Sequence, residues 1–299
     1  TEDGQDVIGI ARGEQLEAIR KRGLVLNTPE ERTEAQFPCV ADPSEIDWQE
    51  DDIILLTVKT QDTLGALERL GAAGVENQAI FCIQNGYSNE DWALRRFPNV
   101  YGVVVAMPVT FLRPGEVNCF AGPRLGIFDI GRHGAGDDRQ GRELAPVLDS
   151  AGFAAFCHGD VAPFKYGKLL LNLGNAVDAC LGDGEGRDAF VAAAREEART
   201  VYARAGIHPA TPHRDDISRF MPVEGMEAGG SSSAQSLKRG TGSIETDYLN
   251  GEIVLLGRRW GIPTPVNAYF AREARRLVFT GQPSGSLTVA DARAALGGM

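Results

Sequence analysis

One apolar stretch of the chain carries a lysine and two asparagines at helical spacing. Lys168, Asn172 and Asn175 stand at positions i, i+4 and i+7, which share one face of a helix, and most of their neighbours are leucines. A buried polar group without a partner costs about 1–3 kcal/mol. These side chains therefore need polar partners, either in a substrate pocket or in a hydrogen-bond network between helices. Burial also lowers the pKa of a lysine toward neutrality, which suits Lys168 to act as a general acid.

Polar residues also follow three short apolar runs in the first half of the chain. Arg12 follows the run 6–11, and Lys59 follows the run 53–58. The run 79–83 leads into Gln84-Asn85-Gly86. Parallel strands have their carboxyl ends at one edge of a sheet, where open α/β sheets bind ligands. We therefore expect these side chains to gather at one ligand site.

Two of these positions suggest contacts with a dinucleotide, and each has an ordinary alternative. Arg12 follows the strand that usually carries an acidic group for the ribose 2′-OH. A basic residue there favours the 2′-phosphate of NADP, unless Arg12 is a solvated surface arginine. Lys59 is a candidate phosphate or ribose contact or a surface lysine. Asn85-Gly86 is also a common pair in turns.

The order of the elements predicts two domains of different class. Strands and helices alternate up to about residue 98, which indicates a mostly parallel sheet with right-handed crossovers. Short runs between 100 and 130 predict an antiparallel extension, followed by a helix over 139–150 and a strand near 153–157. The second half predicts only helices. We expect a Rossmann-like NADP-binding domain at 1–159 and a helical substrate and dimerisation domain at 160–299. The ranges expected to be helical in the second half are 160–181, 187–205, 243–260 and 266–279, with a linker at 229–233.

The start of the chain lacks the glycine-rich turn that usually opens a dinucleotide-binding domain. No G-x-G-x-x-G stands before Asp6. We expect that roughly one strand and one helix, about 20–30 residues, precede Thr1. The residues of the pyrophosphate loop are therefore not named.

Composition excludes several classes of partner and site. The net charge of −11 disfavours nucleic acid and anionic lipid, and no apolar run approaches the ~20 residues of a membrane span. The polar start shows no signal peptide. Five scattered cysteines predict buried free thiols in a reducing compartment, and the spacing of the four histidines disfavours zinc. We expect a cytoplasmic protein without a metal.

Several motifs together resemble the ketopantoate reductase (2-dehydropantoate 2-reductase) family. The pieces hold their order and spacing from Val7 to about Phe270. Each piece is weak alone, and the match rests on all of them in order. They are Ala11-Arg12-Gly13, Val58-Lys59-Thr60, Ile83-Gln84-Asn85-Gly86, Arg113-Pro114-Gly115, Lys168-Leu-Leu-Leu-Asn172, Ser232-Ser233, Glu245-Thr-Asp-Tyr-Leu-Asn-Gly251 and Gly261-Ile-Pro-Thr-Pro265.

The resemblance implies a fold, a reaction and residue roles. It implies a Rossmann domain and a helical C-terminal domain with the active site between them, and a role in pantothenate biosynthesis. Lys168 would protonate the ketone oxygen as hydride arrives from NADPH. Glu245 would hold the substrate hydroxyl. The resemblance further implies that Asn172 orients substrate or lysine, that Ser233 binds the substrate carboxylate, and that Asn85 lies near the nicotinamide and the lysine.

The chain departs from the family pattern on the substrate side. The family asparagine eight residues after the lysine is Ala176 here, with Asn175 one residue early, a rotation of about 100° on a helix. The acidic member of S-S-M-x-x-D is also missing after Ser232-Ser233. Reductase chemistry is therefore better supported than ketopantoate as the substrate. The alternatives are a related NADP-dependent dehydrogenase acting on a different hydroxy or amino acid, and a non-catalytic nucleotide-binding protein.

Overall fold

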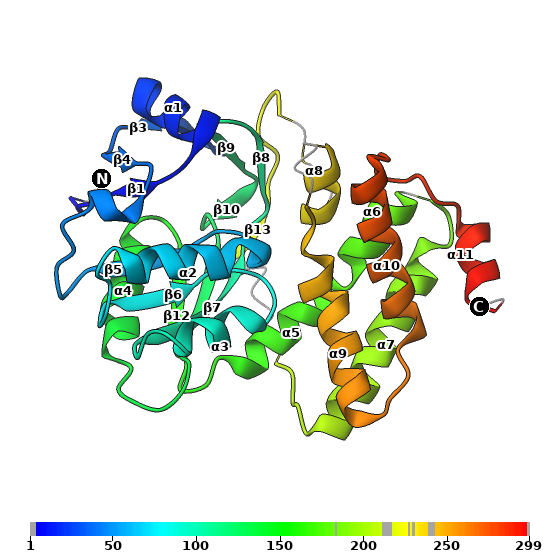
Figure 1. The fold of residues 1–299 in the computed structure, drawn as a ribbon. Helices are drawn as coiled ribbons and strands as arrows, with labels where there is room; N and C mark the ends of the chain where they lie inside the picture. Colours follow the sequence, from blue (N-terminus) through cyan, green and yellow to red (C-terminus); the bar gives the residue numbers. More distant parts are fainter. Residues whose placement is uncertain are drawn as a thin grey trace. The chain divides into compact units, whose positions relative to one another are not determined.

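The computed structural model describes residues 4–182, 184–210, 217–226, 228, 231–238 and 243–297. The chain forms two compact units, each discontinuous in sequence. The sheet unit comprises Thr1–Gln84, Asn89–Val161 and Pro212–Ala228, and the helical unit comprises Asn85–Ser88, Ala162–Thr211 and Gly229–Met299. Both units can be followed by colour along the chain (Figure 1).

A five-stranded sheet forms the centre of the sheet unit, in the order β12-β11-β7-β6-β5. Neighbouring strands are parallel except for the antiparallel pair β7–β11. The strands are β5 (Ile53–Leu56), β6 (Ala79–Cys82), β7 (Val100–Ala106), β11 (Ile127–Arg132) and β12 (Ala154–Cys157).

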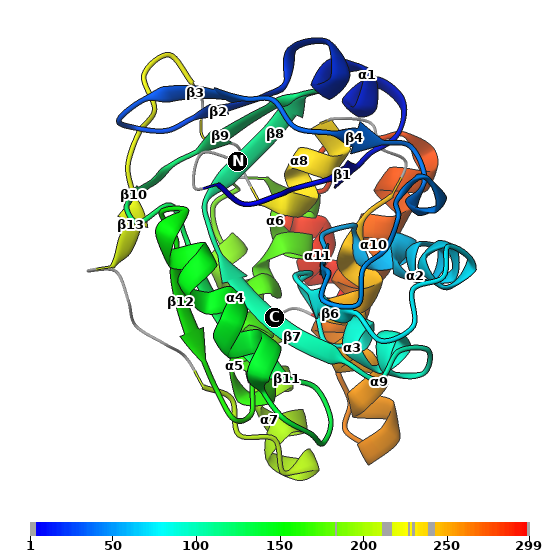
Figure 2. The ribbon, with the colours of Figure 1, turned by 90° about the vertical axis from the view of Figure 1, so that its left-hand side faces the viewer.

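Helices cover both faces of this sheet, as the apolar sequence of its strands requires. In β6, Ile80 and Cys82 belong to one apolar core, whereas Ala79 and Phe81 belong to another. The first core includes residues of α2 (Thr63–Ala72) and α3 (Ser88–Leu94), and the second includes residues of α4 (Arg139–Ser150). Figure 2 shows α4 on one side of the sheet and α3 on the other.

Three smaller sheets complete the sheet unit. A four-stranded sheet has the order β3-β2-β9-β8, and two pairs, β1–β4 and β10–β13, stand apart from it. Helix α1 (Gly13–Arg22) connects β1 to β2 and ends at Gly23, whose φ of 78° is in the region that glycine adopts most readily. The strands are β1 (Gly9–Ile10), β2 (Leu24–Asn27), β3 (Arg32–Ala35), β4 (Cys39–Val40), β8 (Val109–Arg113), β9 (Glu116–Cys119), β10 (Ala121–Pro123) and β13 (Ser218–Phe220).

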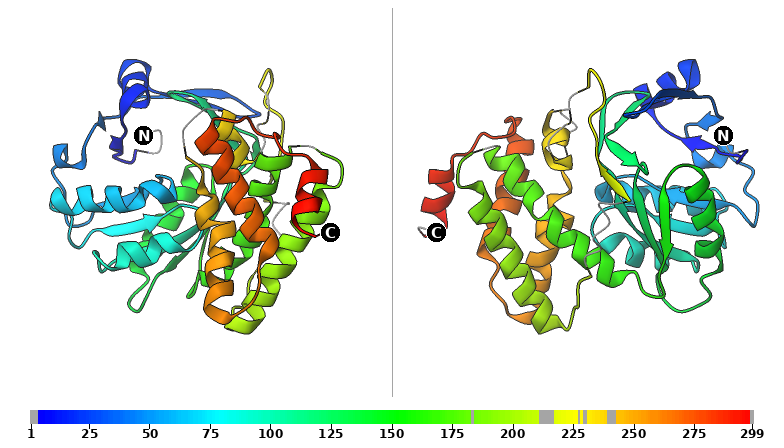
Figure 3. Two further views of the ribbon diagram at one scale, coloured as in Figure 1. Left: turned by 45° about the vertical axis from the view of Figure 1, so that its right-hand side comes forward. Right: turned by 180° about the vertical axis from the view of Figure 1, so that it is seen from behind.

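The helical unit packs its helices around one apolar core. Phe190, Ala194 and Phe270 are among the residues fully enclosed there. Figure 3 shows the long helices of this unit side by side. The helices are α5 (Ala162–Asn172), α6 (Gly174–Leu181), α7 (Arg187–Ala205), α8 (Ser232–Lys238), α9 (Asn250–Trp260), α10 (Pro265–Thr280) and α11 (Val289–Ala295).

The structure confirms the fold class and several boundaries. The helix predicted over 139–150 is α4, and the helix predicted over 187–205 is α7. The prediction of an antiparallel extension of the sheet is correct for β11, which joins the central sheet beside β7. It is wrong for β8 and β9, which pair in the separate four-stranded sheet.

Other predictions for the second half are wrong. Residues 229 and 230 of the linker predicted at 229–233 lie outside the described residues. Its end is wrong, because Ser232 and Ser233 open α8. Residues 218–220 form a strand that pairs with β10, so the second half is not helical throughout. The helix predicted over 243–260 divides into a 3-10 helix, Glu245–Tyr248, and α9. Leu249 separates them with φ −111° and ψ −90°, outside the helical region.

All five cysteines are free, and four are buried as expected. Cys157 is exposed, contrary to the prediction, because it is the last residue of the edge strand β12. None of the described helices is both long enough and apolar enough to span a bilayer.

Candidate active site

Two predicted cofactor residues follow neighbouring parallel strands of the sheet unit. Strands β5 and β6 pair with Leu56 opposite Cys82, so Lys59 and Gln84 follow the same edge of the sheet, as expected. Lys59 is half-buried. The buried Gln84 donates from Nε2 to Oγ1 of Thr63 at 3.2 Å, which ties this amide to α2. This bond gives Gln84 a structural role, and its contact with a cofactor stays a prediction.

Arg12 lies elsewhere in the strand arrangement. The short strand β1 pairs in parallel with β4 and has no hydrogen bonds to β5, so the prediction that all three strand ends share one sheet edge is wrong for β1. Arg12 is exposed at the N-cap position of α1. It makes no ion pair within 4.0 Å with any residue in the described part of the chain, although its charge acts on the Asp42 carboxylate.

The segment Asn85–Ser88 packs with the helical unit, although it directly follows β6. The ring of Tyr87 stacks on that of Tyr166 in α5, with centroids 4.4 Å apart. Gly86 has a φ of 85°, and a Cβ there would lie 2.9 Å from the carbonyl oxygen of Tyr248. Glycine is required at this position for both reasons. The segment is thereby held against the helices that carry the other predicted site residues.

One hydrogen bond joins two of the predicted motifs. Nδ2 of Asn172 donates to Oδ1 of Asn85 at 3.1 Å. Asn172 is buried at the end of α5, and Lys168 stands one helical turn before it. The structure therefore brings Asn85 and Asn172 together. Their contacts with substrate, lysine and cofactor stay predictions.

Lys168 lies in α5 and is half-buried. Desolvation lowers the pKa of its amine below the ordinary lysine value, because burial disfavours the charged form. Among the described residues, no carboxylate contributes to the shift. An amine in this state releases its proton more readily than a surface lysine does.

The single helix predicted over 160–181 is broken, which changes the placement of Asn175. Helix α5 ends at Asn172 and α6 begins at Gly174, so the i, i+4, i+7 prediction is wrong for Asn175. Side chains donate hydrogen bonds to the backbone carbonyl oxygens at the break. Arg195 donates to the oxygens of Leu170 and Leu171 at 3.0 and 3.5 Å. Such insertion into the helical ladder is a recognised cause of helix breaks.

A buried amide network also supports the break, and the sequence analysis missed it. Nδ2 of Asn250 donates to the carbonyl oxygen of Leu173 at 3.1 Å and to Oδ1 of Asn267 at 3.0 Å. Asn267 in turn donates to Glu197 at 2.8 Å, and Glu197 accepts the first backbone N–H groups of α10. Asn250 is the asparagine of the E-x-D-x-x-N-G motif, so the motif itself was the signal that could have found this role.

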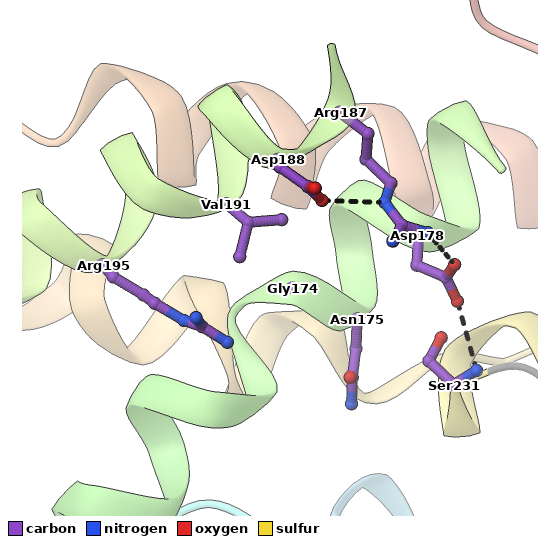
Figure 4. A pocket seen from close by; sticks show the side chains of 8 residues that line it. All are labelled: Gly174, Asn175, Asp178, Arg187, Asp188, Val191, Arg195 and Ser231. Atoms are coloured by element: carbon purple, nitrogen blue, oxygen red, sulfur yellow. Dashed lines mark hydrogen bonds and ion pairs between the residues drawn. The ribbon is translucent and has the colours of Figure 1, made fainter. Parts of the chain in front are cut away.

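The remaining predicted residues lie on three elements of the helical unit. Ser233 is buried in the first turn of α8, and Glu245 is half-buried in the 3-10 helix before α9. Asn175 lines a pocket of about 380 Å³ (Figure 4). The residues lining this pocket are Gly174, Asn175, Asp178, Arg187, Asp188, Val191, Arg195 and Ser231. Lys168 and Asn172 are not among the residues that line it.

The side chains present fit a dinucleotide that carries a 2′-phosphate. Arg12 is exposed and basic, and Lys59 supplies a second cation after β5. Arginine binds phosphate through paired N–H groups. Within the described ranges, no group of three or more His, Cys, Asp or Glu side chains could hold a metal ion.

Comparison with known proteins identifies the family. Residues 1–133 match the family described as ketopantoate reductase PanE/ApbA, and residues 169–277 match the C-terminal part of that family. A 2-dehydropantoate 2-reductase of Archaeoglobus fulgidus is 30% identical over 273 residues, which cover 88% of this chain and 87% of that protein. The chain belongs to the ketopantoate reductase family. It is therefore an NADP-dependent oxidoreductase, of the class that reduces 2-oxo acids.

Further relatives agree with this membership. A 2-dehydropantoate 2-reductase of Pyrococcus horikoshii is 26% identical over 276 residues, covering 88% of this chain and 87% of that protein. The crystal structure of a PanE/ApbA family ketopantoate reductase from Ralstonia eutropha superimposes with a TM-score of 0.76 at 28% identity, covering 94% and 93% of the two chains. A structure of D-mandelate dehydrogenase with NADH and anilino(oxo)acetate gives a TM-score of 0.78 at 23% identity, covering 94% and 93%, and shows the fold alone.

Proposed function

We propose that this ketopantoate reductase family member reduces 2-dehydropantoate (ketopantoate), or a close 2-oxo acid analogue, to the 2-hydroxy acid. Lys168 is the general acid of this reaction. The observation that carries the proposal is the hydrogen bond between Asn172 and Asn85, one helical turn from the desolvated Lys168. The bond joins the K-L-L-L-N and Q-N-G motifs at one place in the helical unit.

Each side chain has a defined part in the proposed reaction. NADPH supplies the hydride when it is bound. Lys168 donates a proton to the ketone oxygen as negative charge develops there, and its positive charge stabilises that oxygen beforehand. The Asn172 amide, fixed by Asn85, orients the substrate or the amine without reorganisation. Glu245 accepts a hydrogen bond from the substrate hydroxyl, and Ser233 binds the carboxylate.

The cofactor contacts are part of the same proposal. Arg12 binds the 2′-phosphate of NADP(H), and Lys59 binds a phosphate or ribose oxygen. Gln84 and Asn85 complete the cofactor side, with Asn85 near the nicotinamide. We further propose that the reaction serves pantothenate biosynthesis in the cytoplasm and that the protein is a homodimer. Light scattering of the purified chain tests the oligomeric state.

Turnover by Lys168→Ala tests the proposal. General acid catalysis contributes about 10²–10⁴-fold, so kcat for ketopantoate should fall by that factor while NADPH still binds. The assay is NADPH oxidation with ketopantoate, and NADPH fluorescence titration measures cofactor binding separately. Lys21→Ala, on the exposed surface of α1, is the matched control and should keep wild-type turnover. Wild-type turnover by Lys168→Ala would refute the role of Lys168.

A different 2-oxo or hydroxy acid is the alternative substrate, and one observation favours it. Ala176 occupies the position where the family has an asparagine and is buried, so that position offers no polar side chain. Asn175 lies beyond the helix break, in α6, and lines the pocket of Figure 4. A panel of 2-oxo acids with NADPH, and of hydroxy acids with NADP, decides between the substrates by kcat/KM. The highest value for an acid other than ketopantoate would establish the alternative.

A further inference from the structure

Asp178 of α6 links three segments of the helical unit through its two carboxylate oxygens. Oδ1 accepts a hydrogen bond from Nη1 of Arg187 at 3.2 Å, and Oδ2 accepts one from the backbone N–H of Ser231 at 3.1 Å. Arg187 begins α7 and also donates to the carbonyl oxygen of Gly182 at 3.3 Å. Figure 4 shows Asp178 between Arg187 and Ser231. The carboxylate therefore ties α6, the start of α7 and Ser231 together.

Ser231 in turn holds the first turn of α8. Its hydroxyl oxygen accepts from the backbone N–H of Ala234 at 3.3 Å, and its carbonyl oxygen accepts from that of Gln235 at 2.9 Å. These are the contacts of a helix N-cap residue. Ser233 lies on the turn that they close and is 3% exposed. Any displacement of Ser231 would therefore displace Ser233.

We propose that Asp178 is a positioning residue, which sets the first turn of α8 so that the Ser233 hydroxyl meets the substrate carboxylate. This inference rests on the proposed function. A hydrogen bond from a neutral N–H to a carboxylate is stronger than one between neutral groups. The pairing with Arg187 offsets the negative charge of Asp178. The Asp178 side chain is 19% exposed and that of Arg187 is 31% exposed, so bulk water screens the pair only in part.

Asp188 provides a matched control within the same group of charges. Its Oδ1 lies 3.6 Å from Nε of the same Arg187, and its side chain is 94% exposed. The variant Asp188→Ala removes one negative charge beside Arg187, as Asp178→Ala does. It leaves the contact with Ser231 intact, so only Asp178→Ala should release α8.

The experiment compares Asp178→Ala, Asp178→Asn and Asp188→Ala in the full chain. It measures kcat and KM for ketopantoate, KM for NADPH, and amide hydrogen exchange across 231–238 without ligands. For Asp178→Ala we expect about a tenfold higher KM for the 2-oxo acid, an unchanged KM for NADPH, and faster exchange in α8. For Asp178→Asn we expect about a threefold rise in KM, because its amide oxygen still accepts the N–H of Ser231 without charge assistance. Asp188→Ala should match the wild type.

Several outcomes would overturn the inference. It fails if Asp178→Ala keeps the wild-type KM and exchange rates, if the KM values for both substrates rise together, or if Asp188→Ala has the same effect. If Asp178→Ala does not fold, Asp178→Asn carries the test, and wild-type values for it refute the inference. If the wild type reduces no 2-oxo acid, both the proposed function and the role of Ser233 are wrong. Amide hydrogen exchange in α8 still shows whether Asp178 holds the helix.

Discussion

Two candidate residues, Asn172 in the helical unit and Arg12 in the sheet unit, are held in different ways. In the helical unit, Asn172 is buried and bonded to Asn85, and the break that follows it is braced by Asn250. In the sheet unit, Arg12 is exposed at the start of α1. Fixed polar groups suit a reacting centre, because they need no reorganisation as charge develops. A long cationic side chain on the surface suits a phosphate, where charge matters more than exact geometry.

We expect the largest effect on activity from changes to Asn85 and Asn172, whose contributions to kcat/KM should be coupled. Each change to alanine removes one partner of a partly buried hydrogen bond and should lower kcat/KM by about tenfold to a hundredfold. The double variant should lose little more than either single one, because residues in direct contact do not act additively. A double-mutant cycle on ketopantoate turnover measures this. Purely additive losses would show that the bond does not order the site.

The close contact of Gly86 gives a smaller effect, on stability. Gly86→Ala places a Cβ 2.9 Å from the Tyr248 oxygen at a φ of 85°. We expect a loss of about 1–3 kcal/mol in the free energy of unfolding, measured by denaturant titration. Gly74→Ala is the control, because Gly74 has a φ of 87° but nothing within 4 Å of a Cβ. Equal losses in both variants would mean that segment 85–88 is not tightly held.

Arg12 should give the smallest effect, confined to the cofactor. Arg12→Ala should raise KM for NADPH about tenfold, because it removes about one hydrogen bond to a charged group. KM for NADH and kcat should not change. Its exposure predicts a stability change within about 0.5 kcal/mol. Initial rates with both cofactors measure the preference. A fall in kcat would contradict the separation between a fixed reacting centre and an adaptable cofactor contact.

Local patterns made much of the fold predictable. Apolar runs located β5 and β6. Periodicity alone could not locate the break between α5 and α6, because apolar residues continue on both sides of it. The break depends on Asn250 and Arg195, which are distant in sequence and donate to carbonyl groups at that point. The pairing of 218–220 with β10 could not be predicted for the same reason, because the two strands are distant in sequence.

For the candidate site, the sequence and the family resemblance supplied the residue types but not their geometry. They singled out Asn85 and Asn172, and the fold joins them through one hydrogen bond. They also grouped Asn175 with Lys168, which required an unbroken helix. The supporting contacts of Asp178 and Asn267 were missed, because single polar residues in helices carry no local signature.

The pH dependence of kcat tests the central claim, that Lys168 is the proton donor, most directly. A general acid must be protonated, and burial lowers the pKa of Lys168. The account predicts that wild-type kcat for ketopantoate falls as pH rises through a value below the ordinary lysine pKa of about 10.4, and that Lys168→Ala lacks this fall. A wild-type profile that stays flat through that range, or the same fall in Lys168→Ala, would contradict the account.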